Sequence, residues 1–193
     1  MKNCELCVPV TDQEIEGLRI GDTVYLTGTI FTSRDMAHLE ISKLLDAGKE
    51  LPVDFRGGVI FHAGPVLKKN GDAWEMVVVG PTTSIRMEPY ADMVGKLGVK
   101  IIVGKGGMKD DTIAACKKHK QVYLQAPPGC AVKLAAAVRK VEGGYWLEKG
   151  MPEALWKLEV ERFGPLVVTM DSYGESIYND IKMRAREIMQ TFS

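Results

Sequence analysis

The sequence has no excess of charge of either sign. Its 193 residues include 25 Lys and Arg and 25 Asp and Glu, so the formal net charge is zero. A protein that attracts nucleic acid through its charge carries a basic surplus or a basic tail, and neither is present. No apolar run approaches the roughly 20 residues that a membrane-spanning helix needs. These absences argue against a nucleic-acid-binding protein and against a membrane protein.

A secretory signal is also missing, because the first ten residues have one early cation and no apolar segment. We therefore expect a cytoplasmic protein. The length suits a single α/β domain, residues 1–193, in which residues 1–17 form an N-terminal extension and a short helix.

Cysteine and histidine are scarce. The four cysteines include one pair at metal-like spacing, Cys4 and Cys7, but no second pair or nearby histidine completes a ligand set. The pattern favours reduced thiols over a metal site, and we predict no metal ligands in this chain. Three scattered histidines are too few for a metal cage, and no Ser/His/Asp set is apparent. A catalytic role for this chain therefore requires an electrophile from elsewhere.

The most informative stretch is EMVVVGPTTSIRM, residues 75–87. The preceding Asn70-Gly71 indicates a hairpin turn, and the run Val77 to Val79 predicts a strand buried on both faces. The strand ends at a Gly-Pro pair, and Thr82 and Arg86 follow in the next turn. Ligands in α/β sheets bind beyond the carboxyl ends of strands, where free backbone N–H groups point outward. We expect the chemistry to begin there.

Strand and helix patterns alternate along the rest of the chain, which is typical of an α/β fold. Helices are predicted over residues 11–18, 32–49, 87–98, 109–120 and 130–141, and strands over 23–29, 59–61, 99–104, 121–125 and 165–171. The C-terminal segment predicts a surface helix with one packed face, formed by Ile177, Ile181, Ala185 and Ile188.

The helix over residues 32–49 has an unusual buried face. Thr32 or Ser33 is its expected N-cap, and its apolar stripe continues toward the N-terminus through Arg34 and His38. Arg34 could simply cap a carbonyl and His38 could be a satisfied, half-buried histidine. The pattern alone slightly favours that structural explanation.

Three cations follow predicted strands: Arg34, Arg86 and Lys105. Cations beside exposed backbone amides suggest an anion pocket, and two or three of them suit a dicarboxylate. The GKGGM turn around Lys105 matches neither a Walker loop nor a GxGxxG turn, so its glycines are better explained by tight backbone geometry. Thr82 could transfer a proton if the neighbouring cations shift it, or it could cap the next helix.

Six blocks together identify a family resemblance: TGTIFTSRDMAH, FHAGPVLKKNGDAWEMVVVGPTTSIRME, VGKGGM, APPGCAV, GMPEALW and FGPLVVTMDSYGESIY. In this order they resemble the β subunit of two-subunit class I iron–sulfur fumarate hydratases and L-tartrate dehydratases. The likeness runs from about Leu18 to Tyr178. It implies a swivelling β/β/α three-layer domain and a separate α subunit that binds a [4Fe-4S] cluster.

The resemblance also implies roles for individual residues. Arg34, Arg86 and Lys105 would bind substrate carboxylates, and Thr82 would take part in moving the C3 proton. Asp35 and His38, the rest of the first motif, would support these residues, for example by orienting Arg34.

Several alternatives stay open at this stage. Fumarate hydration is narrowly favoured over tartrate dehydration, and a non-catalytic anion- or phosphate-binding module and a scaffold subunit are the other classes. A homodimer and an α2β2 assembly fit equally well.

Overall fold

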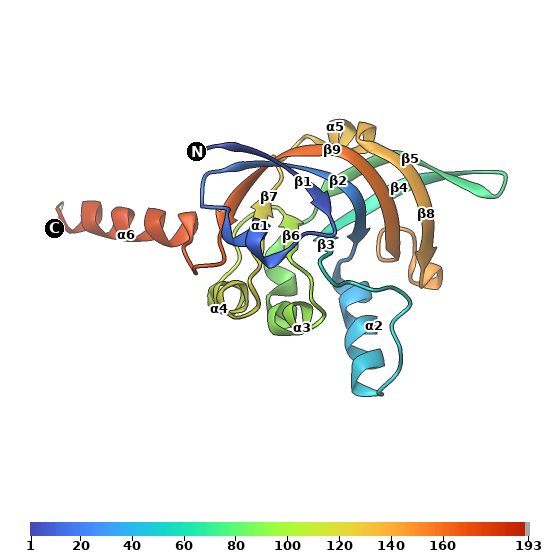
Figure 1. The fold of residues 1–193 in the computed structure, drawn as a ribbon, viewed down its shortest axis with the longest axis horizontal. Helices are drawn as coiled ribbons and strands as arrows, with labels where there is room; N and C mark the ends of the chain where they lie inside the picture. Colours follow the sequence, from blue (N-terminus) through green and yellow to red (C-terminus); the bar gives the residue numbers. More distant parts are fainter. Residues whose placement is uncertain (192–193) are drawn as a thin grey trace.

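The structure is a computed structural model that describes residues 1–191. It is a mixed α/β fold built on a seven-stranded sheet with the order β1-β2-β3-β6-β7-β9-β8. Strand β9 also pairs with β2, so the sheet closes into a barrel-like arrangement (Figure 1). The strands of this sheet are β1 (Asn3–Val8), β2 (Thr23–Thr32), β3 (Val59–Phe61), β6 (Ile101–Gly104), β7 (Val122–Gln125), β8 (Val138–Tyr145) and β9 (Leu155–Met170).

Parallel strands form one half of the barrel. Strands β1, β2, β3, β6 and β7 run parallel to one another in that order, and only β9 returns antiparallel to β2, β7 and β8. The carboxyl ends of β2, β3 and β6 therefore lie at one edge of the sheet. The helical segments are α1 (Asp12–Glu16), α2 (Asp35–Asp46), η1 (Ser84–Tyr90), α3 (Ala91–Lys96), α4 (Asp110–His119), α5 (Ala131–Ala136), η2 (Leu147–Lys149) and α6 (Ile177–Gln190).

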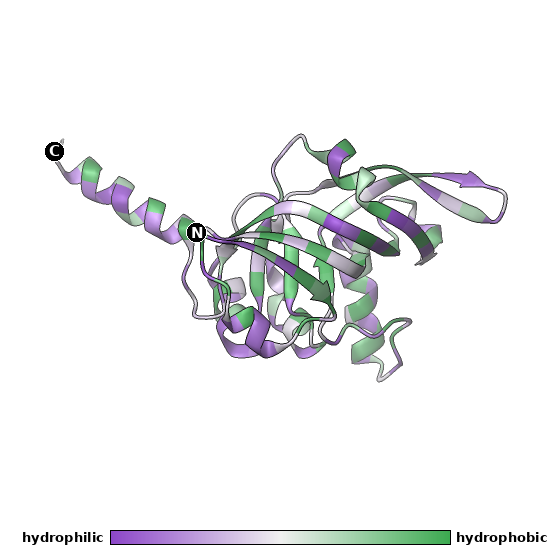
Figure 2. Ribbon diagram, turned by 45° about the horizontal axis from the view of Figure 1, so that its top comes forward, coloured by the Kyte–Doolittle hydropathy of each residue, from purple (hydrophilic) through white to green (hydrophobic). Residues whose placement is uncertain are grey.

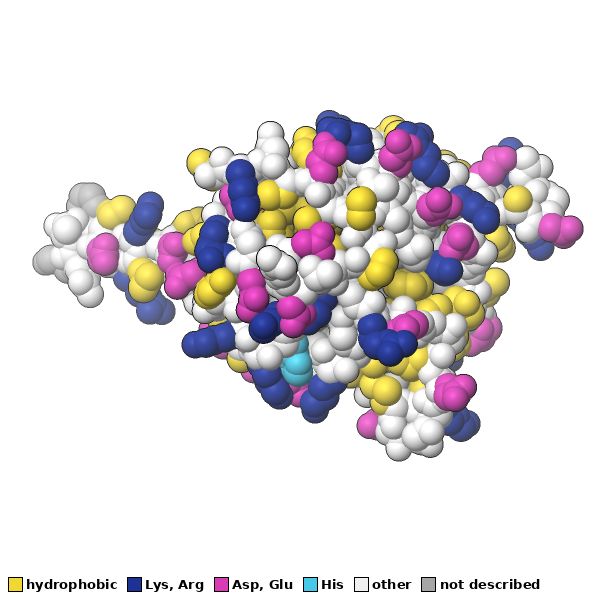
Figure 3. All heavy atoms as spheres, viewed as in Figure 1, with side chains coloured by type: hydrophobic (Ala, Val, Ile, Leu, Met, Phe, Trp, Pro, Cys, Tyr) yellow, Lys and Arg dark blue, Asp and Glu magenta, His cyan; other side chains and the backbone are white. Residues whose placement is uncertain are grey.

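Two apolar clusters share the buried strands. In β6, Ile101 and Val103 face the inside of the barrel, whereas Ile102 faces the layer of helices. Side chains alternate between the two faces of a strand, so a strand buried on both sides needs a continuous apolar sequence. Figure 2 shows this apolar interior within the barrel, and Figure 3 shows Lys and Arg side chains interspersed with Asp and Glu on one outer face.

The prediction that Val77–Val79 form a strand buried on both faces was wrong about the burial. These residues belong to β5 (Ala73–Pro81), whose only strand partner within residues 1–191 is β4 (Ala63–Asn70), in a separate two-stranded hairpin. Val79 is buried, but Val77 is 54% exposed because much of the hairpin extends beyond the barrel (Figure 1). The predicted hairpin itself is confirmed, with Gly71 at a positive φ in its turn.

Residues 1–17 contain β1 in addition to the predicted short helix, and β1 pairs in parallel with β2. Two other predictions were wrong. The helix predicted over 130–141 stops at Ala136, and its second half is the start of β8. The C-terminal helix α6 has no buried residue and projects from the body of the protein (Figures 1 and 2), so its apolar stripe is not packed within the described residues.

No helix in the part of the chain that the structure describes is long and apolar enough to cross a membrane.

Candidate active site

The candidate residues gather where neighbouring strands end. Backbone hydrogen bonds link these ends in series: Ser33 N–H donates to Phe61 O at 2.9 Å, and His62 N–H donates to Val103 O at 2.7 Å. The hairpin joins the same edge, because Thr82 N–H donates to the carbonyl of His62 at 2.7 Å. The fold thus brings together the loops that follow β2, β5 and β6.

Arg86 lies in η1 and is held by Asp35, the first residue of α2. Its Nε donates to Asp35 Oδ1 at 2.8 Å and its Nη2 to Asp35 Oδ2 at 2.9 Å. These bonds lower the pKa of Asp35 to about 2, so its carboxylate stays charged at neutral pH. Nη2 also donates to the Thr82 hydroxyl at 3.0 Å. Asp35 therefore contacts both arginines: Arg86 through two short bonds, and Arg34 through a longer one of 3.4 Å between Nε and Oδ2, so its role in orienting Arg34 stays a prediction.

Arg34 precedes α2 and has a different carboxylate partner. Its Nε is 2.9 Å from Oε1 of Glu153, and the two side chains are 25% and 23% exposed. Arg34 is itself the N-cap of α2, with extended backbone and no capping side chain, so neither Thr32 nor Ser33 is the predicted cap. Glu153 was not among the predicted site residues, although the GMPEALW block that contains it was part of the resemblance.

Lys105 follows β6 directly. It forms a parallel bridge with Thr83, and its carbonyl accepts a hydrogen bond from Ser84 N–H at 3.1 Å. Within residues 1–191 its ammonium group makes no ion pair. The preceding Gly104 has no room for a Cβ, which would overlap the Ser84 hydroxyl. Close packing therefore explains Gly104, in agreement with the prediction that the glycines of the GKGGM turn serve tight backbone geometry.

The three cations and the two carboxylates leave one net positive charge at this edge. A solvent-accessible surface with that charge attracts a dianion but does not neutralise it. Arg86 is 42% exposed and Asp35 37%, so the site is open to solvent in this chain.

A buried polar layer lies beneath the cations. His38 is fully buried, not half-buried as predicted, and its Nδ1 lies 2.9 Å from Ser33 Oγ and 3.1 Å from Arg34 O. The His38 ring packs edge to face on His62, whose Nδ1 lies 2.9 Å from Ser84 Oγ. Both histidines have lowered pKa values, chiefly because burial disfavours the charged imidazolium; that of His38 falls to about 4.

This burial predicts an acid-sensitive fold. The ordinary pKa of 6.5 applies to His38 in the unfolded chain, so between pH 6.5 and about 4 the unfolded state binds the proton and the folded state does not. Neutral His38 therefore contributes about 3 kcal/mol to the free energy of unfolding above pH 6.5, and this contribution is lost as the pH falls to about 4. Urea unfolding across this window should give a flatter pH dependence for His38→Gln than for the parent chain. An identical slope would contradict the assignment.

The four cysteines do not form a ligand set. Cys4 and Cys7 lie on opposite faces of β1, since Cys4 packs against the barrel core and Cys7 is exposed. Cys116 is buried in α4, where burial raises the pKa of its thiol to about 12. No group of three or more His, Cys, Asp or Glu side chains in residues 1–191 could hold a metal ion. The residues present therefore do not fit an iron–sulfur cluster.

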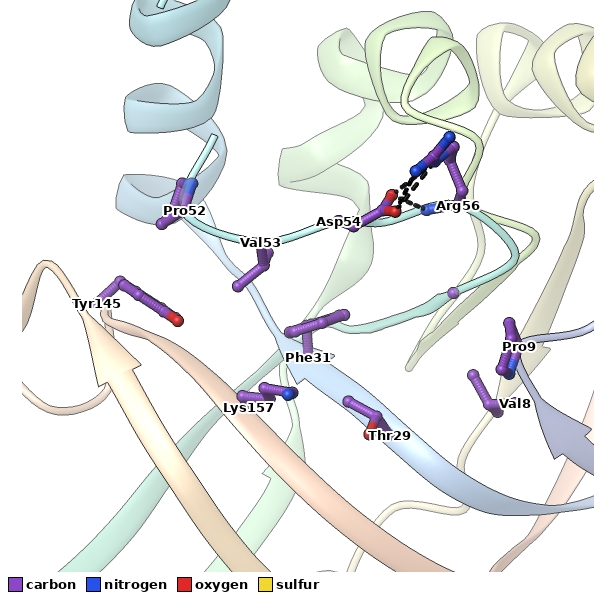
Figure 4. A pocket seen from close by; sticks show the side chains of 11 residues that line it. Val8, Pro9, Thr29, Phe31, Pro52, Val53, Asp54, Arg56, Tyr145 and Lys157 are labelled. Carbon is purple, nitrogen blue, oxygen red and sulfur yellow. Dashed lines mark hydrogen bonds and ion pairs between the residues drawn. The ribbon is translucent and has the colours of Figure 1, made fainter. Parts of the chain in front are cut away.

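The structure also has a cavity of about 360 Å³ whose lining includes none of the candidate residues Arg34, Thr82, Arg86 and Lys105. Figure 4 shows Phe31 and Val53 within it, with Tyr145 and Lys157 on one side and Arg56 paired with Asp54 on the other. Lys157 is paired as well, at 2.7 Å from Glu142. With Asp54 and Glu142 as partners, the two cations of the cavity leave no net charge, whereas the edge at Arg34, Arg86 and Lys105 keeps one net positive charge and therefore attracts an anion more strongly.

The chain is similar to known proteins over most of its length. The family model described as "Fumarase C-terminus" matches residues 1–181. The L(+)-tartrate dehydratase subunit beta of Escherichia coli K12 is 44% identical over 178 residues, which cover 92% of this chain and 87% of that protein. A Geobacillus stearothermophilus protein provisionally named a class I fumarate hydratase is 44% identical over 190 residues, 97% of this chain but 36% of that protein.

Proposed function

Because this chain belongs to the fumarase C-terminus family, we propose that it is the β subunit of an iron–sulfur hydro-lyase that interconverts fumarate and L-malate. The second candidate is dehydration of L-tartrate, which the names of the β-subunit relatives favour. Both substrates are C4 dicarboxylates, and the same cations serve either one. We further propose that the single domain is the swivelling part of the assembly and that it works in the cytoplasm.

One observation carries the proposal: Arg86 contacts the hydroxyl of Thr82 while Asp35 holds its guanidinium in place. Asp35 and Thr82 accept the Nε proton and both Nη2 protons of Arg86, so within residues 1–191 the two N–H donors of Nη1 remain for a substrate carboxylate beside the hydroxyl that exchanges a proton. Lys105 and Arg34 supply further positive charge for the second carboxylate.

In dehydration, the Thr82 alkoxide takes the proton from C3 and becomes a hydroxyl, and the alkoxide is restored when that proton leaves with the departing hydroxide as water; hydration runs these steps in reverse. The neighbouring Arg86 cation stabilises the alkoxide form of Thr82 that accepts the proton. As the proton leaves, negative charge spreads into the adjacent carboxylate, and the fixed cations stabilise that charge without reorganising.

The cysteines of this chain do not suit cluster ligation, so we assign the [4Fe-4S] cluster to a partner α subunit. Departure of the substrate hydroxyl lies outside what the residues of this chain supply. The site is therefore half of a shared site, which fits its exposure on the surface of the isolated chain.

The decisive experiment assays this chain anaerobically with and without the cluster-bearing subunit, on L-malate and on L-tartrate. We expect activity only in the complex, and the larger kcat/KM identifies the substrate. A complex that turns over neither substrate, while the isolated chain binds phosphates, would instead support a non-catalytic anion-binding module.

A further inference from the structure

Glu153 lies in a tightly held turn between η2 and β9. Its N–H donates to Gly150 O at 3.0 Å, and the buried Trp156 donates from its indole Nε1 to Met151 O at 2.8 Å. These bonds fix the backbone of Glu153 to the barrel core, so the position from which its carboxylate reaches Arg34 is fixed as well.

Each oxygen of the Glu153 carboxylate has its own partner. Oε1 lies 2.9 Å from Arg34 Nε, and Oε2 accepts a hydrogen bond from Met36 N–H at 3.1 Å. One side chain therefore fixes both the guanidinium of Arg34 and the first turn of α2, which begins beside it.

The guanidinium is also confined sterically. A Cβ at Gly64 of β4 would lie 3.0 Å from Arg34 Nη1 and 2.8 Å from the Pro152 side chain, so the guanidinium packs beside this glycine. Because Nε forms the ion pair with Glu153 and a longer hydrogen bond to Asp35 Oδ2 at 3.4 Å, the edge formed by Nη1 and Nη2 is the one left within residues 1–191 to bind a carboxylate in the fork geometry.

We propose that Glu153 is a positioning residue that presents this outer edge of Arg34 to a substrate carboxylate. The inference rests on the proposed function, since it requires Arg34 to bind substrate. A merely electrostatic role makes the opposite prediction: removing a negative charge beside the cations would strengthen binding of a dianion and lower KM. The sign of the KM change therefore separates positioning from charge.

The test compares Glu153→Gln and Glu153→Asp in the reconstituted complex. Glu153→Gln removes the negative charge and places an amide N–H donor where one of the two carboxylate oxygens made its contact. Glu153→Asp keeps the charge but has a shorter side chain. We expect KM for the dicarboxylate to rise about tenfold in both variants, while kcat changes less than about threefold. Glu161→Gln is the matched control, because Glu161 forms the same kind of pair with Arg139 Nε, at 2.7 Å, and touches none of the site residues.

A double-mutant cycle supplies the second readout. If Glu153 acts through Arg34, adding Glu153→Gln to an Arg34→Lys complex should change KM less than about twofold. An unchanged or lowered KM in Glu153→Gln, or full additivity with Arg34→Lys, overturns the inference. If Arg34→Lys itself leaves KM unchanged, the role of Arg34 in the proposed function has failed instead.

Discussion

Replacing Arg86 by Ala should lower kcat/KM of the reconstituted complex about 10³-fold. Arg86 is the group that contacts both Asp35 and the Thr82 hydroxyl, so the substitution removes a carboxylate-binding cation, the positive charge beside the proton-transfer group and the partner of Asp35 in one step. Arg86→Lys should recover only a small part of the loss, because an ammonium group cannot make the two parallel bonds to Asp35. Steady-state kinetics on the preferred substrate measure both variants.

The control for this experiment is Arg56→Ala. Arg56 also donates from Nε and Nη2 to one aspartate, Asp54, at 3.0 and 2.6 Å, but it lies away from the candidate site. Its loss should leave kcat/KM within about twofold, since exposed ion pairs contribute little. If Arg86→Ala were as active as Arg56→Ala, the chain would be a scaffold subunit and the catalytic proposal would fall.

Replacing Thr82 by Val should lower kcat about 10³-fold with little change in KM. Valine keeps the shape of threonine but has no hydroxyl, so proton transfer at C3 loses its acceptor. Arg86 keeps both of its bonds to Asp35, and for that reason the carboxylate-binding edge should stay in place. The rate at which the C3 hydrogen of L-malate exchanges with deuterated solvent reports the same step directly.

Thr83→Val is the neighbouring control. Thr83 is exposed and meets Lys105 through its backbone, so loss of its hydroxyl should leave both kcat and the exchange rate close to those of the parent complex. Equal effects of the two substitutions would mean that Thr82 has no special role in proton transfer.

Local signals in the sequence predicted many elements of the fold. The capping box at Thr11 and Glu14, the Asn70-Gly71 turn and the apolar side of Met87, Ala91 and Val94 all appear in the structure as expected. These features depend on residues three or four positions apart, or on a turn that only certain residues adopt, and such short-range physics is visible in one dimension.

Contacts between segments that are far apart in the sequence could not be predicted in this way. The run Val77–Val79 has the composition of a buried strand, but burial depends on what packs against each side chain, and the described residues bury Val79 while they leave Val77 54% exposed. Similarly, Val138 and its neighbours have helical spacing, yet pairing with β9 makes them a strand. Tertiary contacts override weak local propensity in both cases.

By itself the sequence determined which groups could do chemistry: Arg34, Thr82, Arg86 and Lys105 follow strands in recognisable motifs, and the family follows from those motifs. Only the tertiary structure decided their partners. It pairs Asp35 with Arg86 across 51 positions, and it pairs Arg34, which follows β2, with Glu153, which precedes the neighbouring strand β9. The physical reason is that hydrogen bonds and ion pairs act over about 3 Å in space, whereas a sequence motif records only neighbours along the chain.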